Sequence, residues 1–230
     1  MPGAGRRYIR PVVVGHGLEQ RYGSPAGAAA YRTKYDGSWA RRLSARREAG
    51  LLRWALAAAG TEGVALDAPC GAGRLTPVLL ERAHRVTAVD LSPAMVDEAR
   101  ATLAGPVADG RVVLGTGSVD ALPFADGAFD TAVCWRLLHH VTDPAARVRI
   151  LAGLARVSRR AVVVTFADAG TWKARFQRWR GRDRRCVKLS LDALAAEARE
   201  ARLDLGPTRR LSSAFSLLAV AVLRPAAPAG

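Results

Sequence analysis

The stretch 65-ALDAPCGAGRLTPVLL-80 decides the fold of this chain, because it joins a short apolar strand to a helix through a bare turn. The pattern predicts a strand over residues 64–66 and a helix near residues 74–82. Gly71 and Gly73 permit a positive φ and a close approach of the backbone to a ligand. The first turn of the helix offers unpaired N–H groups, which favour an anionic group such as a carboxylate or a phosphate.

Strand and helix patterns alternate along the rest of the chain. Further strands are expected over 85–90, 111–116, 130–135, 161–166 and 216–224, and helices over 40–59, 93–103, 144–157 and 191–201. This alternation predicts an α/β fold with a mostly parallel sheet and helices on both faces, whose ligands bind beyond the carboxyl ends of the strands. We expect an N-terminal arm or lid over residues 1–39, one domain over 40–224 and a disordered tail over 225–230.

A dinucleotide-binding site is the first ligand hypothesis for the glycine turn. Asp90 ends the second strand, where an acid accepts hydrogen bonds from ribose hydroxyls. The dinucleotide fingerprint also needs a glycine or alanine three residues after Gly73, and that position is Thr76. The sequence therefore argues against NAD while it keeps a ribose-binding acid.

Three segments at successive strand ends carry a resemblance to a known family. They are LDAPCGAGR (66–74), LSPAMVDEAR (91–100) directly after Asp90, and GSVDALPFADGAFDTAVCWRLLHHVTDP (117–144). Together they resemble the class I S-adenosylmethionine-dependent methyltransferases, closest to the group that contains the ubiquinone and menaquinone C-methyltransferases. The resemblance covers roughly Leu52 to Leu223. It implies a Rossmann-like, doubly wound, seven-stranded sheet with an antiparallel last strand, and S-adenosyl-L-methionine as the cofactor.

The resemblance also implies a cofactor site. The glycine turn would hold the methionine part, Asp90 would take the ribose hydroxyls and Leu91 would pack on adenine. The family's adenine contact falls here on Gly117, Ser118 and Val119, with Asp120 as a fallback acceptor. The residues expected at the cofactor are Asp67, Cys70, Gly71, Gly73, Asp90, Leu91, Ser118, Val119, Asp120 and Cys134.

No catalytic triad or metal-ligand spacing is visible in the sequence, and no metal is expected. His139, His140 and Tyr35 are candidates for a general base, because histidine titrates near neutrality. A pocket-wall role is the alternative for the two histidines. Cys134 fits a small packing residue better than a nucleophile, because no base is paired with it.

Two segments are candidates for the methyl acceptor. Tyr31, Tyr35 and Trp39 share one helical face and form either a lid over the cofactor or a packed arm. The connection 171-TWKARFQRWRGRDRRCVK-188 holds eight basic residues and one acid, with Trp172, Phe176 and Trp179 at helical spacing. A solvated surface, an anionic small substrate, a membrane surface and RNA all fit that connection. The expected acceptor contacts are Tyr31, Trp39, Arg136 and Arg178.

Composition limits the partners. The net charge of +15 would suit nucleic acid, but 32 of the 35 basic residues are arginine, which also fits a GC-rich coding bias. Three scattered cysteines and the absence of a long apolar run indicate a reduced, cytoplasmic protein without a transmembrane segment.

The sequence thus predicts a methyltransferase acting on a small molecule, anionic and partly apolar, such as a quinone, a lipid-like compound or a secondary metabolite. An RNA methyltransferase and a cofactor-binding protein without methyl transfer are the alternatives. The oligomeric state is left open.

Overall fold

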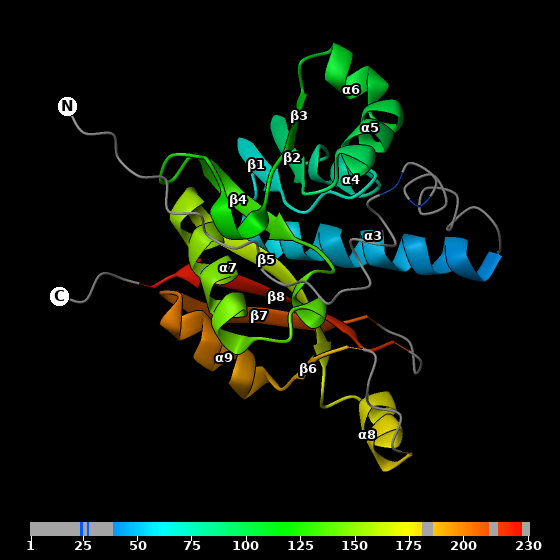
Figure 1. The fold of residues 1–230 in the computed structure, drawn as a ribbon, viewed down its shortest axis with the longest axis vertical. Coiled ribbons are helices and arrows are strands. Elements are labelled where there is room, and N and C mark those ends of the chain that lie inside the picture. Colours follow the sequence, from blue (N-terminus) through cyan, green and yellow to red (C-terminus); the bar gives the residue numbers. More distant parts are fainter. Residues whose placement is uncertain (1–23, 25–26, 28–38, 181–185, 212–215, 227–230) are drawn as a thin grey trace.

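The computed structural model describes residues 24, 27, 39–180, 186–211 and 216–226. Its centre is an eight-stranded sheet in the order β3-β2-β1-β4-β5-β8-β7, with the short β6 paired to β5 (Figure 1). The strands are β1 (Val64–Asp67), β2 (Arg85–Asp90), β3 (Val112–Thr116), β4 (Phe129–Cys134), β5 (Ser158–Asp168), β6 (Lys188–Leu189), β7 (Leu203–Arg210) and β8 (Leu218–Pro225).

The strand directions confirm the predicted fold class. Strands β1 to β5 pair in parallel, and β8 runs antiparallel to both β5 and β7. The apolar last strand expected over residues 216–224 is therefore the antiparallel one. The two-residue β6 raises the number of strands from the predicted seven to eight.

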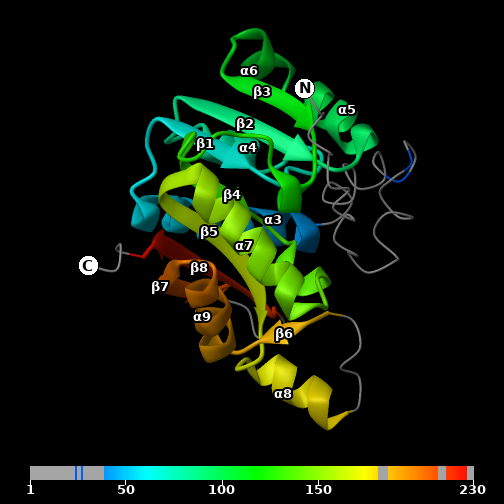
Figure 2. The same cartoon turned by 60° about the vertical axis from the view of Figure 1, so that its left-hand side comes forward.

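Helices cover both faces of the sheet. In Figure 2, α7 (Pro144–Val157) and α9 (Leu191–Glu200) lie in front of it, and α3 (Trp39–Ala59) lies behind. The other helices are α4 (Thr76–Leu79), α5 (Pro93–Thr102), α6 (Ala104–Ala108) and α8 (Trp172–Trp179), with short turns η1 (Val119–Ala121) and η2 (Leu138–His140).

Each face has its own apolar core, because successive strand residues point to opposite sides. Along β5, Val162 and Val164 pack with the leucines of α7 and α9, whereas Ala161 and Val163 pack with those of α3 and α4. All four side chains are fully buried. The sheet is thus a rigid platform whose edge can hold functional groups in fixed positions.

Strand β7 was missed by sequence reasoning, although the family resemblance implied a seventh strand. Its sequence LDLGPTRR contains Gly206 and Pro207, which interrupt the alternation expected of a strand. The structure accommodates them by a register shift between Leu205 and Thr208, next to the edge of the sheet. Helix α4 is also shorter than the helix expected over residues 74–82.

The domain boundaries remain predictions. Residues 1–38, apart from Ser24 and Gly27, and residues 227–230 lie outside the described part of the chain, so the lid and the tail are not tested. Among the described residues, no helix is long and apolar enough to cross a membrane.

Candidate functional site

The predicted cofactor residues gather where β1 and β2 end. The two strands pair in parallel with Asp67 opposite Ala88, so Asp67 and Asp90 lie at the same edge of the sheet. The glycine turn connects this edge to α4. The carboxyl ends of the central strands therefore meet at the place where an open α/β sheet binds its ligands.

Asp90 is fixed at this edge by two backbone donors. Gly71 N–H donates to its Oδ2 at 2.8 Å, and Ser92 N–H donates to its Oδ1 at 3.0 Å. The residue is 9% exposed. Burial raises the pKa of Asp90, and the backbone hydrogen bonds from Ser92 and Gly71 oppose that rise. Each carboxylate oxygen keeps acceptor capacity for a ligand hydroxyl, because a carboxylate has about four lone-pair sites.

Asp67 is the more deeply buried acid. It is 2% exposed, and the hydroxyl of Thr76 donates to its Oδ2 at 2.7 Å. Burial raises the pKa of Asp67 to about 7, and the nearby charge of Asp90 adds to the rise. Asp67 and Asp90 therefore repel each other when both are ionised. A cationic ligand beside them would stabilise both charges.

The two glycines of the turn have different reasons to lack a side chain. Both have a positive φ, 55° at Gly71 and 75° at Gly73, as the sequence predicted. A Cβ on Gly73 would lie 2.8 Å from Cδ1 of Leu103 and 3.2 Å from Cβ of Ala99. Gly73 therefore lacks a side chain because α5 and Leu103, the residue after it, pack closely against its backbone. Gly71 instead supplies the donor that holds Asp90.

The residues expected to contact adenine line the same edge at the ends of β2 and β3. Leu91 directly follows β2 and is 41% exposed, so an apolar surface is open beside Asp90. The hydroxyl of Ser118 donates to Oδ1 of Asp120, and Val119 begins η1 and is 7% exposed. The Ser118–Asp120 bond links the predicted acceptor to its alternative. Which of them takes the adenine amino group stays a prediction.

The residues at and after the end of β4 place buried polar groups next to the end of β1. Cys134 is fully buried in the core, and burial raises the pKa of its thiol to about 12, so a packing role fits. Trp135 Nε1 and His139 Nδ1 are buried and have no hydrogen-bond partner within the described residues. Burial, with His140 and Arg136 nearby, lowers the pKa of His139 to about 3. His139 is therefore neutral and weakly basic at physiological pH.

A buried ion-pair cluster that the sequence did not predict joins α3 to this edge. Glu48 of α3 is 2% exposed, and it accepts from Arg74 at 2.7 Å and from Arg136 at 2.7 Å. Arg136 has a left-handed φ of 61°, and its N–H donates to Oγ1 of Thr165 at 2.6 Å. Pattern analysis could not find the cluster, because it joins one turn of α3 to two distant loops. The feature of the sequence that could have indicated the cluster is Glu48, a single glutamate on a helix rich in arginine.

The expected acceptor residues are dispersed. Arg136 lies beside the site but is paired with Glu48, and Arg178 lies on α8, beyond the end of β5. Trp39 begins α3 and is 78% exposed. Tyr31 and Tyr35 lie outside the described residues. Where the chain is described, no group of three or more His, Cys, Asp or Glu residues gathers to hold a metal ion.

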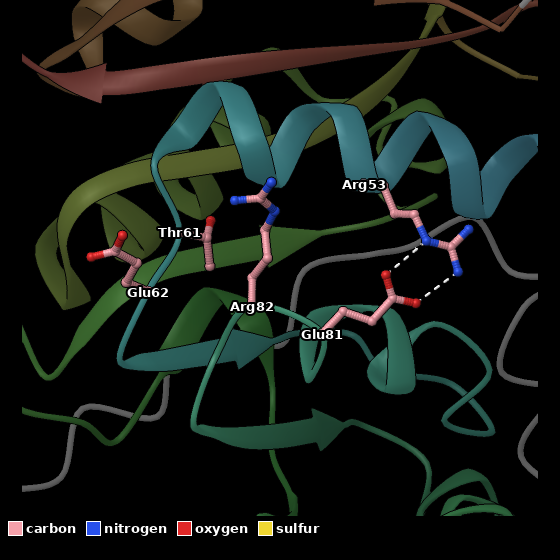
Figure 3. A pocket seen from close by; sticks show the side chains of 5 residues that line it. All are labelled: Arg53, Thr61, Glu62, Glu81 and Arg82. Atoms are coloured by element: carbon pink, nitrogen blue, oxygen red, sulfur yellow. Dashed lines mark hydrogen bonds and ion pairs between the residues drawn. The ribbon is translucent and has the colours of Figure 1, made fainter.

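A pocket of about 460 Å³ lies elsewhere, lined by Arg53, Thr61, Glu62, Glu81 and Arg82 (Figure 3). Thr61 and Glu62 precede β1, and Arg82 precedes β2, so this pocket lies at the amino ends of the strands. Four of its five lining side chains are charged, and the Arg53–Glu81 ion pair among them is solvent-exposed. We place the candidate site at Asp67 and Asp90 instead, because ligands of such sheets bind at the opposite edge.

The chain resembles proteins of known family and fold. Residues 65–161 match the family model described as "Methyltransferase domain". A ubiquinone biosynthesis O-methyltransferase of Xanthomonas euvesicatoria is 38% identical over 94 residues, which cover 40% of this chain and 38% of that protein. One from Xanthomonas oryzae is 37% identical over 92 residues with the same coverage. The chain therefore matches well under half the length of these relatives.

Solved structures share the fold over most of the chain. Magnesium protoporphyrin IX methyltransferase from Synechocystis, with bound SAH, has a TM-score of 0.75 at 21% identity, covering 91% of this chain and 98% of its own. The [4+2]-cyclase SpnF has a TM-score of 0.61 at 18% identity, covering 77% and 81%. These matches confirm the predicted resemblance: residues 65–161 match a methyltransferase-domain model, and the chain has the fold of class I methyltransferases.

Proposed function

We propose that this chain binds S-adenosylmethionine and transfers its methyl group to a small molecule that is anionic and partly apolar. The observation that carries the proposal is Asp90, held at the carboxyl end of β2 by the N–H groups of Gly71 and Ser92. A carboxylate fixed by two backbone donors is preorganised to accept from two adjacent hydroxyls, as on a ribose.

The residues present fit the cofactor along its length. Asp90 takes the ribose, the exposed Leu91 offers its side chain to adenine, and Ser118 with Asp120 supplies polar acceptors at the rim. The acids Asp67 and Asp90 suit the positively charged methionine part. Arg74 lies beside the glycine turn and suits its carboxylate. The cofactor supplies an already activated methyl group on a sulfonium.

The chain's own contribution is then binding and alignment. Methyl transfer from a sulfonium needs the two reactants close together and in line, which a rigid sheet edge provides. A general base is needed only for an acceptor that must lose a proton. His139 has its pKa lowered to about 3, which makes it a poor general base and a better hydrogen-bonding wall of the pocket.

The chemistry around the ends of β4 and β5 supports the acceptor class. Trp135 Nε1 and His139 Nδ1 are buried polar atoms without a partner in the described chain, and they suit polar groups of an acceptor. Lys188 on β6 and Arg178 on α8 would stabilise a negative charge nearby. Burial, together with the charge of Arg178, lowers the pKa of Lys188. The relatives named as ubiquinone biosynthesis O-methyltransferases also favour a small acceptor.

A cofactor-binding protein with a different reaction is the second candidate. The [4+2]-cyclase among the structural neighbours has this fold, so the fold alone does not establish methyl transfer. Only a measured product separates the two candidates. We retain the expectation of a cytoplasmic protein, for which the three free cysteines are the support.

The first experiment measures ligand binding by calorimetry. The wild-type chain should bind S-adenosylmethionine and S-adenosylhomocysteine, and should not bind NAD. Asp90→Ala should weaken cofactor binding at least tenfold, because a hydrogen bond to a charged group is worth about 1.5–3 kcal/mol. Asp97→Ala removes an exposed acid from the following helix and is the matched control. NAD binding without a response to S-adenosylhomocysteine would disprove the proposal.

The second experiment identifies the acceptor. Cofactor labelled on its methyl group is incubated with the chain and with cell extract separated into RNA, lipid and small-molecule fractions. Label should enter the small-molecule or lipid fraction and should depend on Asp90. Label in RNA would favour the RNA methyltransferase, and cofactor binding without any labelled product would favour the second candidate.

A further inference from the structure

Helix α8 stands apart from the body of the protein. It follows the end of β5 and lies beyond the rest of the fold in both views (Figures 1 and 2). Thr171 caps it by accepting from Ala174 N–H at 3.2 Å, and Ala174 is its one buried residue. Amphipathic helices normally gain their stability by packing an apolar face on a core. The packing of α8 on this fold is minimal.

The aromatic face of α8 is open to solvent. Trp172 is 65% exposed, Phe176 36% and Trp179 80%. The three rings form a continuous row: the Trp172 and Phe176 centroids are 5.4 Å apart with the rings stacked, and Phe176 and Trp179 are 5.9 Å apart. Soluble proteins rarely expose a contiguous row of large aromatic side chains unless it meets another surface.

The same helix is strongly basic. Lys173, Arg175, Arg178 and Arg180 are interleaved with the rings, and no acid occurs between Asp168 and Asp183. The Arg180 guanidinium lies 5.0 Å from the centroid of the Phe176 ring. A surface that complements this helix must therefore be apolar and negatively charged at once.

An anionic lipid bilayer meets both demands. Tryptophan prefers the boundary between headgroups and acyl chains, and each Lys or Arg near an anionic leaflet adds electrostatic attraction. Single-stranded RNA stacks its bases on free ring faces, whereas the Phe176 ring is already stacked with Trp172 and contacted by the Arg180 guanidinium. A second copy of the chain would bring the same basic residues together and be repelled.

We propose that α8 is a docking helix that inserts Trp172, Phe176 and Trp179 into the interface of an anionic membrane. Its basic residues contact the headgroups, and the helix lies in the plane of the surface without crossing the bilayer. Because α8 follows β5, docking brings the carboxyl edge of the sheet, with Asp90, toward the membrane. The proposal goes beyond methyl transfer and does not require it.

Co-sedimentation with vesicles tests the proposal on the full chain. Vesicles of equal parts phosphatidylglycerol and phosphatidylcholine should bind the wild-type chain, and pure phosphatidylcholine should bind it much less. Trp172→Ala with Trp179→Ala should lower binding to the anionic vesicles at least about tenfold. Trp39→Ala is the matched control, because Trp39 is 78% exposed, much like Trp179 at 80%. Binding should also weaken as salt rises.

Several outcomes would overturn the proposal. They are equal binding to neutral and anionic vesicles, a double variant that binds like the wild type, or a Trp39→Ala loss as large as that of the double variant. Tight binding of single-stranded RNA that depends on Trp172 and Trp179, without vesicle binding, would assign the helix to RNA. Calorimetry with S-adenosylhomocysteine on the double variant keeps this test separate from the proposed function, because cofactor affinity should be unchanged.

Discussion

Thr76 shows how one residue connects the sequence to the site. In the sequence, it breaks the dinucleotide fingerprint that Gly71 and Gly73 begin. In the structure, it is fully buried and its hydroxyl donates to Oδ2 of Asp67 at 2.7 Å. The pattern predicted what the position excludes, and only the packing reveals that the threonine holds an acid. The identity of residue 76 therefore predicted the class of ligand, but it did not predict the hydrogen bond to Asp67.

Asp67 makes the stability of the fold depend on pH. Its folded-state pKa is about 7 and its ordinary value is 3.8, so the folded chain keeps a proton that the unfolded chain has lost between those values. Stability should therefore fall as pH rises from about 4 to about 7, and then level off. A shift of about three pKa units corresponds to at most about 4 kcal/mol.

Urea unfolding across this pH range checks the prediction. Asp67→Asn keeps an acceptor for Thr76 but cannot titrate, so its stability should vary less with pH than that of the wild type. The difference between the two curves reports on Asp67 together with its electrostatic coupling to Asp90, whose own pKa is also raised and which titrates in both proteins. Parallel curves would mean that Asp67 titrates near its ordinary value.

At the scale of elements, local signals were predictable and tertiary ones were not. The start of α5 is capped by Ser92, which accepts from Met95 N–H at 3.3 Å, as its sequence suggested. Helix α7 covers residues 144–157 as predicted. The contacts of α3 with the loops after β1 and β4 could not be predicted, because residues 48, 74 and 136 are distant in the chain.

Glu48 tests whether α3 is part of the site. Glu48→Ala should destabilise the fold by about 3 kcal/mol, the low end for breaking a buried ion pair, because Arg74 and Arg136 lose this buried acid but are themselves partly exposed. Both arginines flank the proposed cofactor site, so S-adenosylhomocysteine affinity should also fall. Urea unfolding and calorimetry measure the two effects.

The exposed pair Arg53–Glu81 provides the control for Glu48. Its two hydrogen bonds are both 2.7 Å long, as are those that Glu48 accepts, but the Arg53–Glu81 pair is exposed to solvent. Exposed pairs contribute little, so Glu81→Ala should leave both measurements unchanged. A Glu48 variant that behaves like Glu81→Ala would mean that the cluster is only an incidental contact.

At the scale of the whole molecule, the dominant feature is the net charge. Composition predicted it, and folding does not neutralise it. The chain carries +15, and an interior ion pair such as Arg147–Glu197 combines one acid with one arginine and leaves that excess unchanged. How that excess is distributed could not be read from composition. The structure places three basic residues on the projecting α8 and a fourth, Arg180, at its C-cap. A high net charge favours solubility and destabilises the compact state by self-repulsion.

Salt should therefore stabilise this fold. The Debye length shrinks from about 30 Å at 0.01 M to about 8 Å at 0.15 M ionic strength, which screens repulsion across the molecule. Exposed pairs such as Arg156–Asp126 lose some attraction, but each is worth little, and the buried Glu48 pairs are screened less. The melting temperature should rise between those two concentrations of sodium chloride. Sodium sulfate at equal ionic strength should give the same rise, and a larger one would indicate a bound anion instead of screening. A falling melting temperature would show that the ion pairs outweigh the repulsion.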